Sequence, residues 1–196
     1  MLRAARTPAV FLDRDGVINR DRREYVRRWA EFQFLPGVLE AFRLLAPLPY
    51  RIIVVTNQSA IGRGFIDRSV VENIHRLMIA EIAGAGGRVD AVYYCPHAPE
   101  AGCDCRKPRP GLFLQAASDW QLDLETSWAI GDSARDIAAA SAIGVRGILV
   151  RTSHGQDDVE HLFPIANAMV CFDLLHAVTS LVSRARRVDP SETTGD

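Results

Sequence analysis

The stretch that decides the fold is AVFLDRDG, residues 9–16. A short apolar run that ends in charged residues and a glycine is typical of a buried strand followed by a turn. Similar apolar runs recur along the chain at 51–55, 91–94, 127–130, 145–150 and 168–172. Segments with a period near 3.6 residues lie between them and predict helices at 37–46, 68–83, 110–120, 133–143 and about 173–187.

This alternation of strand and helix predicts an α/β fold. Strands that are apolar on both sides belong to a mainly parallel sheet covered by helices on both faces, which makes three layers. We expect one domain over residues 1–187 and a disordered polar tail over 188–196. In such folds ligands bind beyond the carboxyl ends of the strands, so the residues that follow each strand are the candidates for function.

Composition excludes several classes of protein. Of the 196 residues 48% are hydrophobic and 24% are charged, and the net charge is -1, which is ordinary for a soluble globular domain. This balance argues against a nucleic-acid partner and against attraction to an anionic membrane. The sequence has no apolar run long enough to span a bilayer and no apolar segment typical of a signal peptide. We therefore expect a cytoplasmic protein, and a monomer.

Three strand ends carry residues suited to phosphate chemistry. Asp13 and Asp15 follow the first strand, Thr56 begins the motif TNQS after the second, and Asp132 begins DSARD after the fourth. Each motif alone is also explained by a turn or, at Ser133, by a helix cap. Together with Lys107 they form a set that can attack, neutralise and hold a phosphate, with Mg²⁺ as the expected partner of the carboxylates.

The segment CPHAPEAGCDCRKPRPG, residues 95–111, contains three of the four cysteines. Cys95, His97, Cys103 and Cys105 are the right number and type of ligands to fill a tetrahedral Zn²⁺ completely, and closed zinc sites are structural. A catalytic metal centre is the alternative, but four protein ligands leave no open position. The positive pair Arg106-Lys107 follows the last ligand directly, so an ordered loop would fix its position.

The ordered motifs DRDG, TNQS, RKP and GDSxxD resemble those of the haloacid dehalogenase (HAD) superfamily of aspartyl-phosphate phosphatases, over roughly residues 9–150. The resemblance implies an HAD-like Rossmannoid fold and a Mg²⁺-dependent phosphoric monoester hydrolase. The implied roles are Asp13 as nucleophile, Asp15 as general acid and base, Thr56 and Lys107 as phosphoryl stabilisers, and Mg²⁺ bound by Asp13, the Asp15 carbonyl and Asp132. Asp136 would orient the metal shell or Lys107.

The intervals between the motifs are too short for a cap domain, because 43 positions separate Asp13 from Thr56 and 51 separate Thr56 from Lys107. The substrate would then be held by loops near 19–34, 58–66 and the cysteine segment. The zinc loop followed by RKPRPG resembles the heptose-1,7-bisphosphate 7-phosphatase branch. That branch releases the 7-phosphate to make heptose 1-phosphate for nucleotide-activated heptose of lipopolysaccharide, S-layer or capsule. The resemblance implies substrate contacts from Asp21, Tyr25, Asn57, Gln58, Ser59 and Arg106.

Other interpretations stay open at this point. Histidinol-phosphate phosphatase shares the zinc loop, and a capless nucleic-acid 3′-phosphatase or a non-catalytic zinc-knuckle module would share parts of the pattern. Several residues are more simply structural. The charge run RDRREYVRR, residues 20–28, is interpreted mostly as a solvated face. The scattered histidines and the fourth cysteine are interpreted as surface or packing residues; these are His75, His154, His161, His176 and Cys171.

Overall fold

The structure, a computed structural model, describes residues 6–153 and 168–188. Six strands form one parallel sheet in the order β3-β2-β1-β4-β5-β6. Their bounds are β1 Thr7–Leu12, β2 Arg51–Asn57, β3 Ala91–Cys95, β4 Leu122–Gly131, β5 Arg146–Val150 and β6 Ala168–Cys171. The predicted strands and the parallel sheet are thereby confirmed. His154, His161 and residues 189–196 of the expected tail lie outside the described residues.

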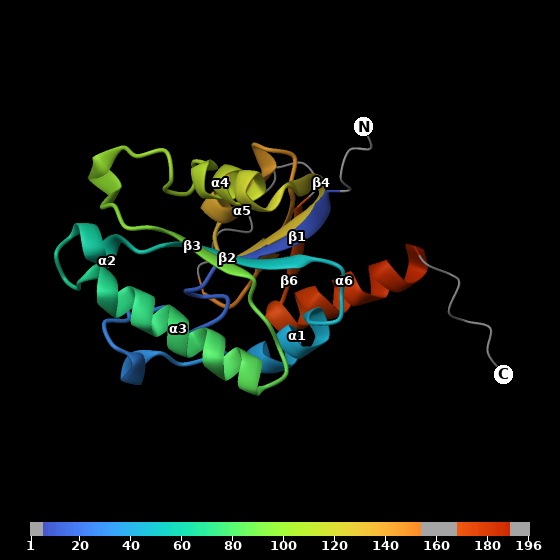
Figure 1. The fold of residues 1–196 in the computed structure, drawn as a ribbon, viewed down its shortest axis with the longest axis horizontal. Coiled ribbons are helices and arrows are strands. Elements are labelled where there is room, and N and C mark those ends of the chain that lie inside the picture. The colour runs from blue at the N-terminus through green and yellow to red at the C-terminus, as the bar shows by residue number, and fades with distance from the viewer. Residues whose placement is uncertain (1–5, 154–167, 189–196) are drawn as a thin grey trace.

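Helices cover both faces of this sheet (Figure 1). The α-helices are α1 Val38–Leu45, α2 Ser59–Gly62, α3 Arg68–Gly84, α4 Gly111–Trp120, α5 Ala134–Ser141 and α6 Leu174–Val188, and the short 3-10 turns are η1 Trp29–Glu31 and η2 Pro99–Ala101. Helices α1, α3 and α6 pack on one face, and α4 and α5 pack on the other (Figure 1). The expected three-layer architecture is confirmed.

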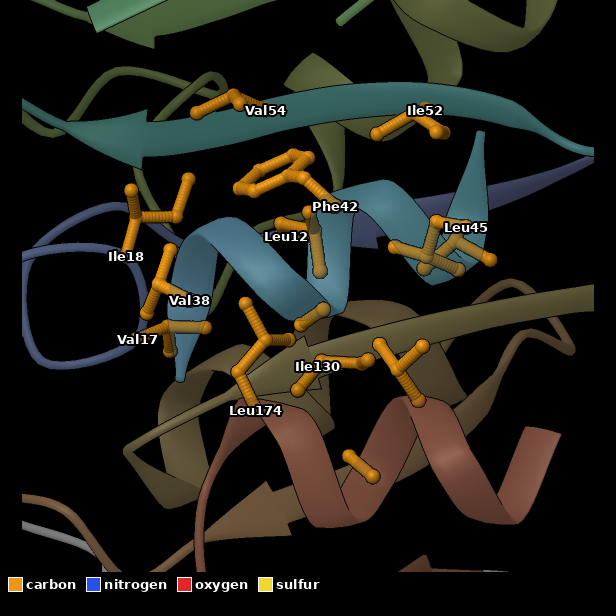
Figure 2. Packing of buried hydrophobic residues seen from close by; sticks show 14 of the residues in the cluster. Leu12, Val17, Ile18, Val38, Phe42, Leu45, Ile52, Val54, Ile130 and Leu174 are labelled. Atoms are coloured by element: carbon orange, nitrogen blue, oxygen red, sulfur yellow. The ribbon is translucent and has the colours of Figure 1, made fainter. Parts of the chain in front are cut away.

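Strand β1 lies in the middle of the sheet and shows why two layers of helices are needed. Its side chains alternate, so that Val10 and Leu12 join one buried cluster while Ala9 and Phe11 join the other. On the first face, Phe42 and Leu45 of α1 pack beneath β2 (Figure 2). Because both faces of β1 are removed from water, the strand end that follows it is held rigidly.

The structure differs from the sequence-based expectation at two elements. Strand β4 begins at Leu122, five residues before the expected start, because its pairing with β1 shifts register between Pro8 and Val10. The Ser127 hydroxyl accepts a hydrogen bond from the Ala9 amide at 2.8 Å at this irregularity. In addition, Ser59–Gly62 of the expected loop forms the short helix α2. Neither difference moves the strand ends that carry the motifs.

Two helix starts differ in how they are capped. Ser133 caps α5 in a reciprocal capping box with Asp136, as predicted. Asp67 lies at the N-cap position of α3, but its side chain makes no capping hydrogen bond. None of the helices in the described ranges is both long enough and apolar enough to cross a bilayer.

Candidate functional site

Parallel pairing brings the predicted acids to one edge of the sheet. Asp13 follows β1 and Asp132 follows β4, and the Asp13 amide donates to the Ile130 carbonyl at 2.9 Å, which fixes the register of the two strand ends. A cavity of about 350 Å³ opens there, a volume suited to a small ligand. The predicted residues on its wall are Asp13, Asp15, Asp21, Tyr25, Thr56, Asn57, Ser59, Arg106, Lys107 and Asp132.

Lys107 is the buried cation of this cavity. Its ammonium donates to the Val55 carbonyl at 2.8 Å and forms ion pairs with Asp13 at 2.9 Å and Asp136 at 2.7 Å. Burial alone would lower the pKa of Lys107, but the two carboxylates raise it above its usual value, so the group stays charged. Asn57 exchanges hydrogen bonds of 3.2 Å with the Lys107 backbone in both directions, which positions the lysine from a neighbouring strand.

Asp136 contacts Lys107 from the first turn of α5. Its other oxygen accepts the Ser133 amide at 3.1 Å as part of the capping box, so the helix start determines where the carboxylate lies. A side chain at Gly131 would place its first carbon 2.3 Å from the Asp136 side chain, so this close approach requires glycine. The geometry agrees with the expectation that Asp136 orients Lys107.

The acids of the site disfavour one another's negative charge. Burial, together with the neighbouring Asp136 and Asp15, raises the pKa of Asp13 to about 6 although Lys107 opposes the shift. Burial and the charges of Asp13 and Asp136 raise the pKa of Asp132 to about 8. A bound cation would remove this penalty.

The donor set fits a hard divalent cation. One oxygen of Asp132 is buried without a hydrogen-bond partner, and ligand oxygens of Asp13, Asp132 and Asp136 lie within 4.8 Å of one another. Carboxylate oxygens in small number are what Mg²⁺ takes in proteins. Gly16 permits the close approach of Asp132, because a side-chain carbon there would lie 2.0 Å from the carboxylate, and its φ of 83° also favours glycine.

Asp15 is held by three donors. The Arg14 guanidinium contacts both carboxylate oxygens at 2.6 and 2.7 Å, while the amides of Asn19 and Gln58 each donate at 2.9 Å. Burial would raise the pKa of Asp15, but the Arg14 charge and these hydrogen bonds hold it below its usual range. Gln58 therefore faces Asp15 and also donates to Thr56 at 3.0 Å, and it does not line the cavity.

Arg14 is a site residue that the sequence analysis missed. It is only 1% exposed, and its second nitrogen lies 3.4 Å from the His75 ring. Burial and the Arg14 charge lower the pKa of His75 to about 3, so His75 is neutral and fits its interpretation as a packing residue. The position of Arg14 between the two acids of DRDG could have suggested that it belongs to the site. A residue at such a position can equally point to solvent, so the sequence did not decide its role.

Loop 19–34 forms one wall of the cavity. Its base is closed by the Arg20 amide donating to Gln33 at 2.8 Å. Its tip packs on Phe65, whose ring lies 5.7 Å from Tyr25 and 5.0 Å from the Arg27 guanidinium. Arg22 and Arg23 line the cavity, and Arg22 has a buried Nε atom, so the interpretation of this charge run as a solvated face is wrong for Arg22, whereas Arg23 is exposed. Sequence alone does not show which arginines of such a run turn inward.

The four predicted zinc ligands converge. The Cys95, Cys103 and Cys105 sulfurs lie 3.2 to 3.5 Å apart, and the His97 Nδ1 atom lies 3.2 Å from Cys105. Donors at metal–sulfur bonds of about 2.3 Å around a tetrahedral ion are about 3.8 Å apart, so the cluster is close to this arrangement. Burial and the neighbouring thiols raise the pKa of Cys105 to about 12, a penalty that a shared cation would relieve.

The cysteine loop is also joined to the rest of the site. Gly62 of α2 packs against this loop so closely that a side-chain carbon would lie 2.4 Å from the Ala98 nitrogen. The backbone amide of Gln58 donates a hydrogen bond to the Cys95 carbonyl at 2.8 Å.

A larger hollow of about 1070 Å³, lined by Tyr50, Trp128 and His176 among others, contains none of the acids above. The smaller cavity at the strand ends is therefore the candidate site.

From the raised pKa of Asp132 we expect the magnesium-free protein to become less stable as the pH rises from 6.5 to 8. Its pKa is about 8 when folded and 3.8 ordinarily, so in this window the folded protein holds a proton that the unfolded chain has released. His75 opposes the trend only at the lower end of the window, because its folded pKa is about 3 and the unfolded chain releases the last of this proton just above its ordinary value of 6.5.

The free energy of unfolding should fall by up to ~1.4 kcal/mol per pH unit, measured by denaturant unfolding in magnesium-free buffer. Asp132→Asn is the control, since an amide does not titrate and should abolish most of the slope. Identical pH profiles for the two proteins would contradict the assignment of the proton to Asp132.

Known proteins share this fold and these motifs. The HAD-hydrolase-like family profile matches residues 104–177. The D-glycero-β-D-manno-heptose-1,7-bisphosphate 7-phosphatase of Pseudomonas putida is 40% identical over 169 residues, which are 86% of this chain and 95% of that protein. The enzyme of the same name from Vibrio cholerae is 46% identical over 153 residues, covering 74% and 82% of the two chains.

A crystal structure of D,D-heptose 1,7-bisphosphate phosphatase from Bordetella bronchiseptica, complexed with magnesium and phosphate, superposes with a TM-score of 0.86. It is 37% identical and covers 90% of this chain and 99% of its own. Identities of this size over nearly the whole length of the relatives go far beyond a shared fold. The chain belongs to the heptose-1,7-bisphosphate 7-phosphatase family of HAD-like hydrolases.

Proposed function

We propose that this protein is a phosphatase that removes the 7-phosphate of D-glycero-β-D-manno-heptose 1,7-bisphosphate and releases heptose 1-phosphate. The observation that carries this proposal is the buried Asp13–Lys107 pair, 2.9 Å apart, at the wall of a cavity that arginines also line. The family membership supports the choice of substrate. The product is a precursor of nucleotide-activated heptose, and we expect a monomeric enzyme that acts in the cytoplasm through the single domain of residues 1–187.

The chemistry follows from the positions of two acids and one lysine. An Asp13 oxygen attacks phosphorus, and the bond between phosphorus and the sugar oxygen breaks while Asp15 gives its proton to that oxygen. Water then attacks the aspartyl-phosphate, Asp15 takes the water proton, and Asp13 leaves as a carboxylate with inorganic phosphate released. Lys107 and Thr56 hold the phosphoryl oxygens and offset their negative charge.

Asp15 has to serve both as acid and as base. Its bidentate contact with Arg14 and its lowered pKa suit the second half-reaction, in which a carboxylate accepts the proton of water. In the first half-reaction Asp15 must carry a proton, so the contact with Arg14 has to loosen before the leaving oxygen departs. His75, which lies next to Arg14, is neutral, so it does not compete with Asp15 for the charge of the Arg14 guanidinium.

Two metals complete the proposal. Mg²⁺ would be held by Asp13, the Asp15 carbonyl and Asp132, and when bound it supplies positive charge to the phosphoryl oxygens during transfer. Zn²⁺ would be held by Cys95, His97, Cys103 and Cys105 and would order the segment that precedes Arg106 and Lys107. Asp21, Tyr25, Asn57, Ser59 and Arg106 would contact the sugar or its second phosphate. Gln58 would act through Asp15.

A parallel substrate panel tests the proposed function. Phosphate release is measured from heptose 1,7-bisphosphate, histidinol phosphate and a 3′-phosphorylated oligonucleotide, each with and without Mg²⁺. We expect the highest kcat/KM for the heptose bisphosphate and no turnover without the metal. A higher kcat/KM for histidinol phosphate would overturn the substrate assignment, and no hydrolysis of any phosphomonoester would favour the non-catalytic alternative.

Asp13→Asn should abolish turnover and leave the fold intact. An amide is a poor nucleophile for phosphorus, so the rate should fall by at least about 10³-fold, measured as phosphate release under single-turnover conditions. Circular dichroism and thermal unfolding check the fold. The matched control is Asp67→Asn, an exposed aspartate at the start of α3 that touches none of the site. Near-wild-type phosphate release from Asp13→Asn would sink the nucleophile assignment.

Cys103→Ala should raise KM more than it lowers kcat. The zinc loop positions Arg106 and Lys107, and a looser loop weakens phosphate binding before it alters the attacking carboxylate. The measurement is steady-state kinetics alongside zinc content by atomic absorption. Cys171→Ala is the control, because this cysteine lies in β6 outside the cluster. An unchanged KM in a folded, zinc-free Cys103→Ala protein would refute the positioning role.

A further inference from the structure

Three arginines on the wall of the cavity, Arg14, Arg22 and Arg106, have a buried nitrogen without a hydrogen-bond partner in the described part of the chain. The Nε atom of Arg22 and an Nη atom of Arg106 are shielded from solvent, and neither donates a hydrogen bond within the described part of the chain. A buried guanidinium N–H with no acceptor is costly, and the cost is larger for a charged group than for a neutral one. Both therefore lie ready for an acceptor that enters the cavity.

Four other cations of this cavity interact with acids outside the proposed ligand. Arg14 is paired with Asp15, and Lys107 is paired with Asp13 and Asp136. Arg63 lies 3.6 Å from Glu100, and the charge of Arg135 acts on Asp132. Arg14 keeps an unpartnered Nε atom, but its charge is already paired with Asp15, and Arg23 is exposed to solvent. Arg22 and Arg106 are therefore the lining arginines that combine a buried, unpartnered donor with no ion pair among the described residues.

Glu31 is the acid that could instead explain the orientation of Arg22. The Arg22 charge contributes, as the last of several causes, to the lowered pKa of Glu31. The two Glu31 oxygens, however, accept hydrogen bonds from the Arg27 amide at 3.0 Å and from the Arg28 side chain at 2.8 Å. Glu31 thus ties down loop 19–34 through Arg27 and Arg28 and leaves the Arg22 Nε atom unpaired.

Arg22 and Arg106 approach the cavity from two different loops. Arg106 follows the last cysteine of the zinc cluster, and Arg22 lies in a turn closed by the Tyr25 amide donating to the Arg22 carbonyl at 2.9 Å. Tyr25 adopts φ 64° in this turn and packs on Phe65, so the arginine is presented by a loop that is anchored on both sides. A guanidinium is planar, always charged and suited to bidentate contact with phosphate oxygens.

We propose that Arg22 acts with Arg106 as a clamp for the second phosphate of the substrate, the one that is not cleaved. This inference rests on the proposed function, in which the first phosphate lies at Asp13 and Lys107. Arg106 was expected to contact the substrate from the sequence resemblance, whereas Arg22 is assigned by the structure. Arg22 is then a specificity residue that distinguishes a sugar bisphosphate from a monophosphate.

Binding to the Asp13→Asn protein tests the clamp separately from turnover. Isothermal titration in the presence of Mg²⁺ compares heptose 1,7-bisphosphate with heptose 7-phosphate, and we expect the bisphosphate to bind more tightly. Adding Arg22→Gln should weaken bisphosphate binding about 10- to 100-fold, the loss expected for charge-assisted hydrogen bonds. Binding of the monophosphate should weaken by less than about threefold, so the preference largely disappears.

Two matched variants separate recognition from loop structure. Arg20→Gln removes an exposed charge of the same loop that does not line the cavity, and Glu31→Gln weakens the ties to Arg27 and Arg28. Both should retain the preference for the bisphosphate.

The clamp is overturned if Arg22→Gln keeps the preference, if Glu31→Gln abolishes it equally, or if the Asp13→Asn parent shows no preference. Failure of the proposed function would instead appear as absent turnover of the bisphosphate by the wild-type protein, whatever the titrations show.

Discussion

The site depends on one buried ammonium group shared by two carboxylates. Lys107 lies between Asp13 and Asp136 at hydrogen-bonding distance, so one buried ammonium group compensates for the burial of two carboxyl groups. Each of the three side chains reaches the contact from a different element, namely the end of β1, the loop before α4 and the first turn of α5. The triad therefore couples strand register, the zinc loop and a helix cap to a single point.

The rest of the site distributes charge around that point. Arg14 forms an ion pair with Asp15, while Asp132 keeps a buried oxygen without a hydrogen-bond partner, which suits a cation site. Arg22 and Arg106 on the outer wall each keep a buried nitrogen without a hydrogen-bond partner in the described part of the chain. A sugar with a phosphate at each end carries negative charge that complements the lysine and the arginines of this cavity. The geometry and the family relationship therefore point to the same substrate class.

Much of this could be predicted because the strands are short, apolar and buried. AVFL and most of RIIVV are apolar on both sides, and helical segments lie between the strands, which favours a parallel sheet between two helical layers. The carboxyl edge of such a sheet collects the acids that follow the strands. The early start of β4 could not be predicted, since residues 122–126 are mostly polar and their pairing with β1 depends on Ser127 bridging a register shift. Local pattern carries no information about such a partner.

Sequence by itself determined the residue types and their order. These are the strand-end acids, the four potential zinc ligands and the lysine that follows them. Their spacing is a property of the chain, and the chemistry of each group follows from its type. Tertiary structure alone decided which neighbour each group meets. It turned Gln58 and Arg14 toward Asp15, and it turned Arg22 into the cavity although the surrounding charge run looked solvated. These outcomes depend on contacts between loops far apart in the chain, where burial and charge compensation, rather than local preference, set the direction of each side chain.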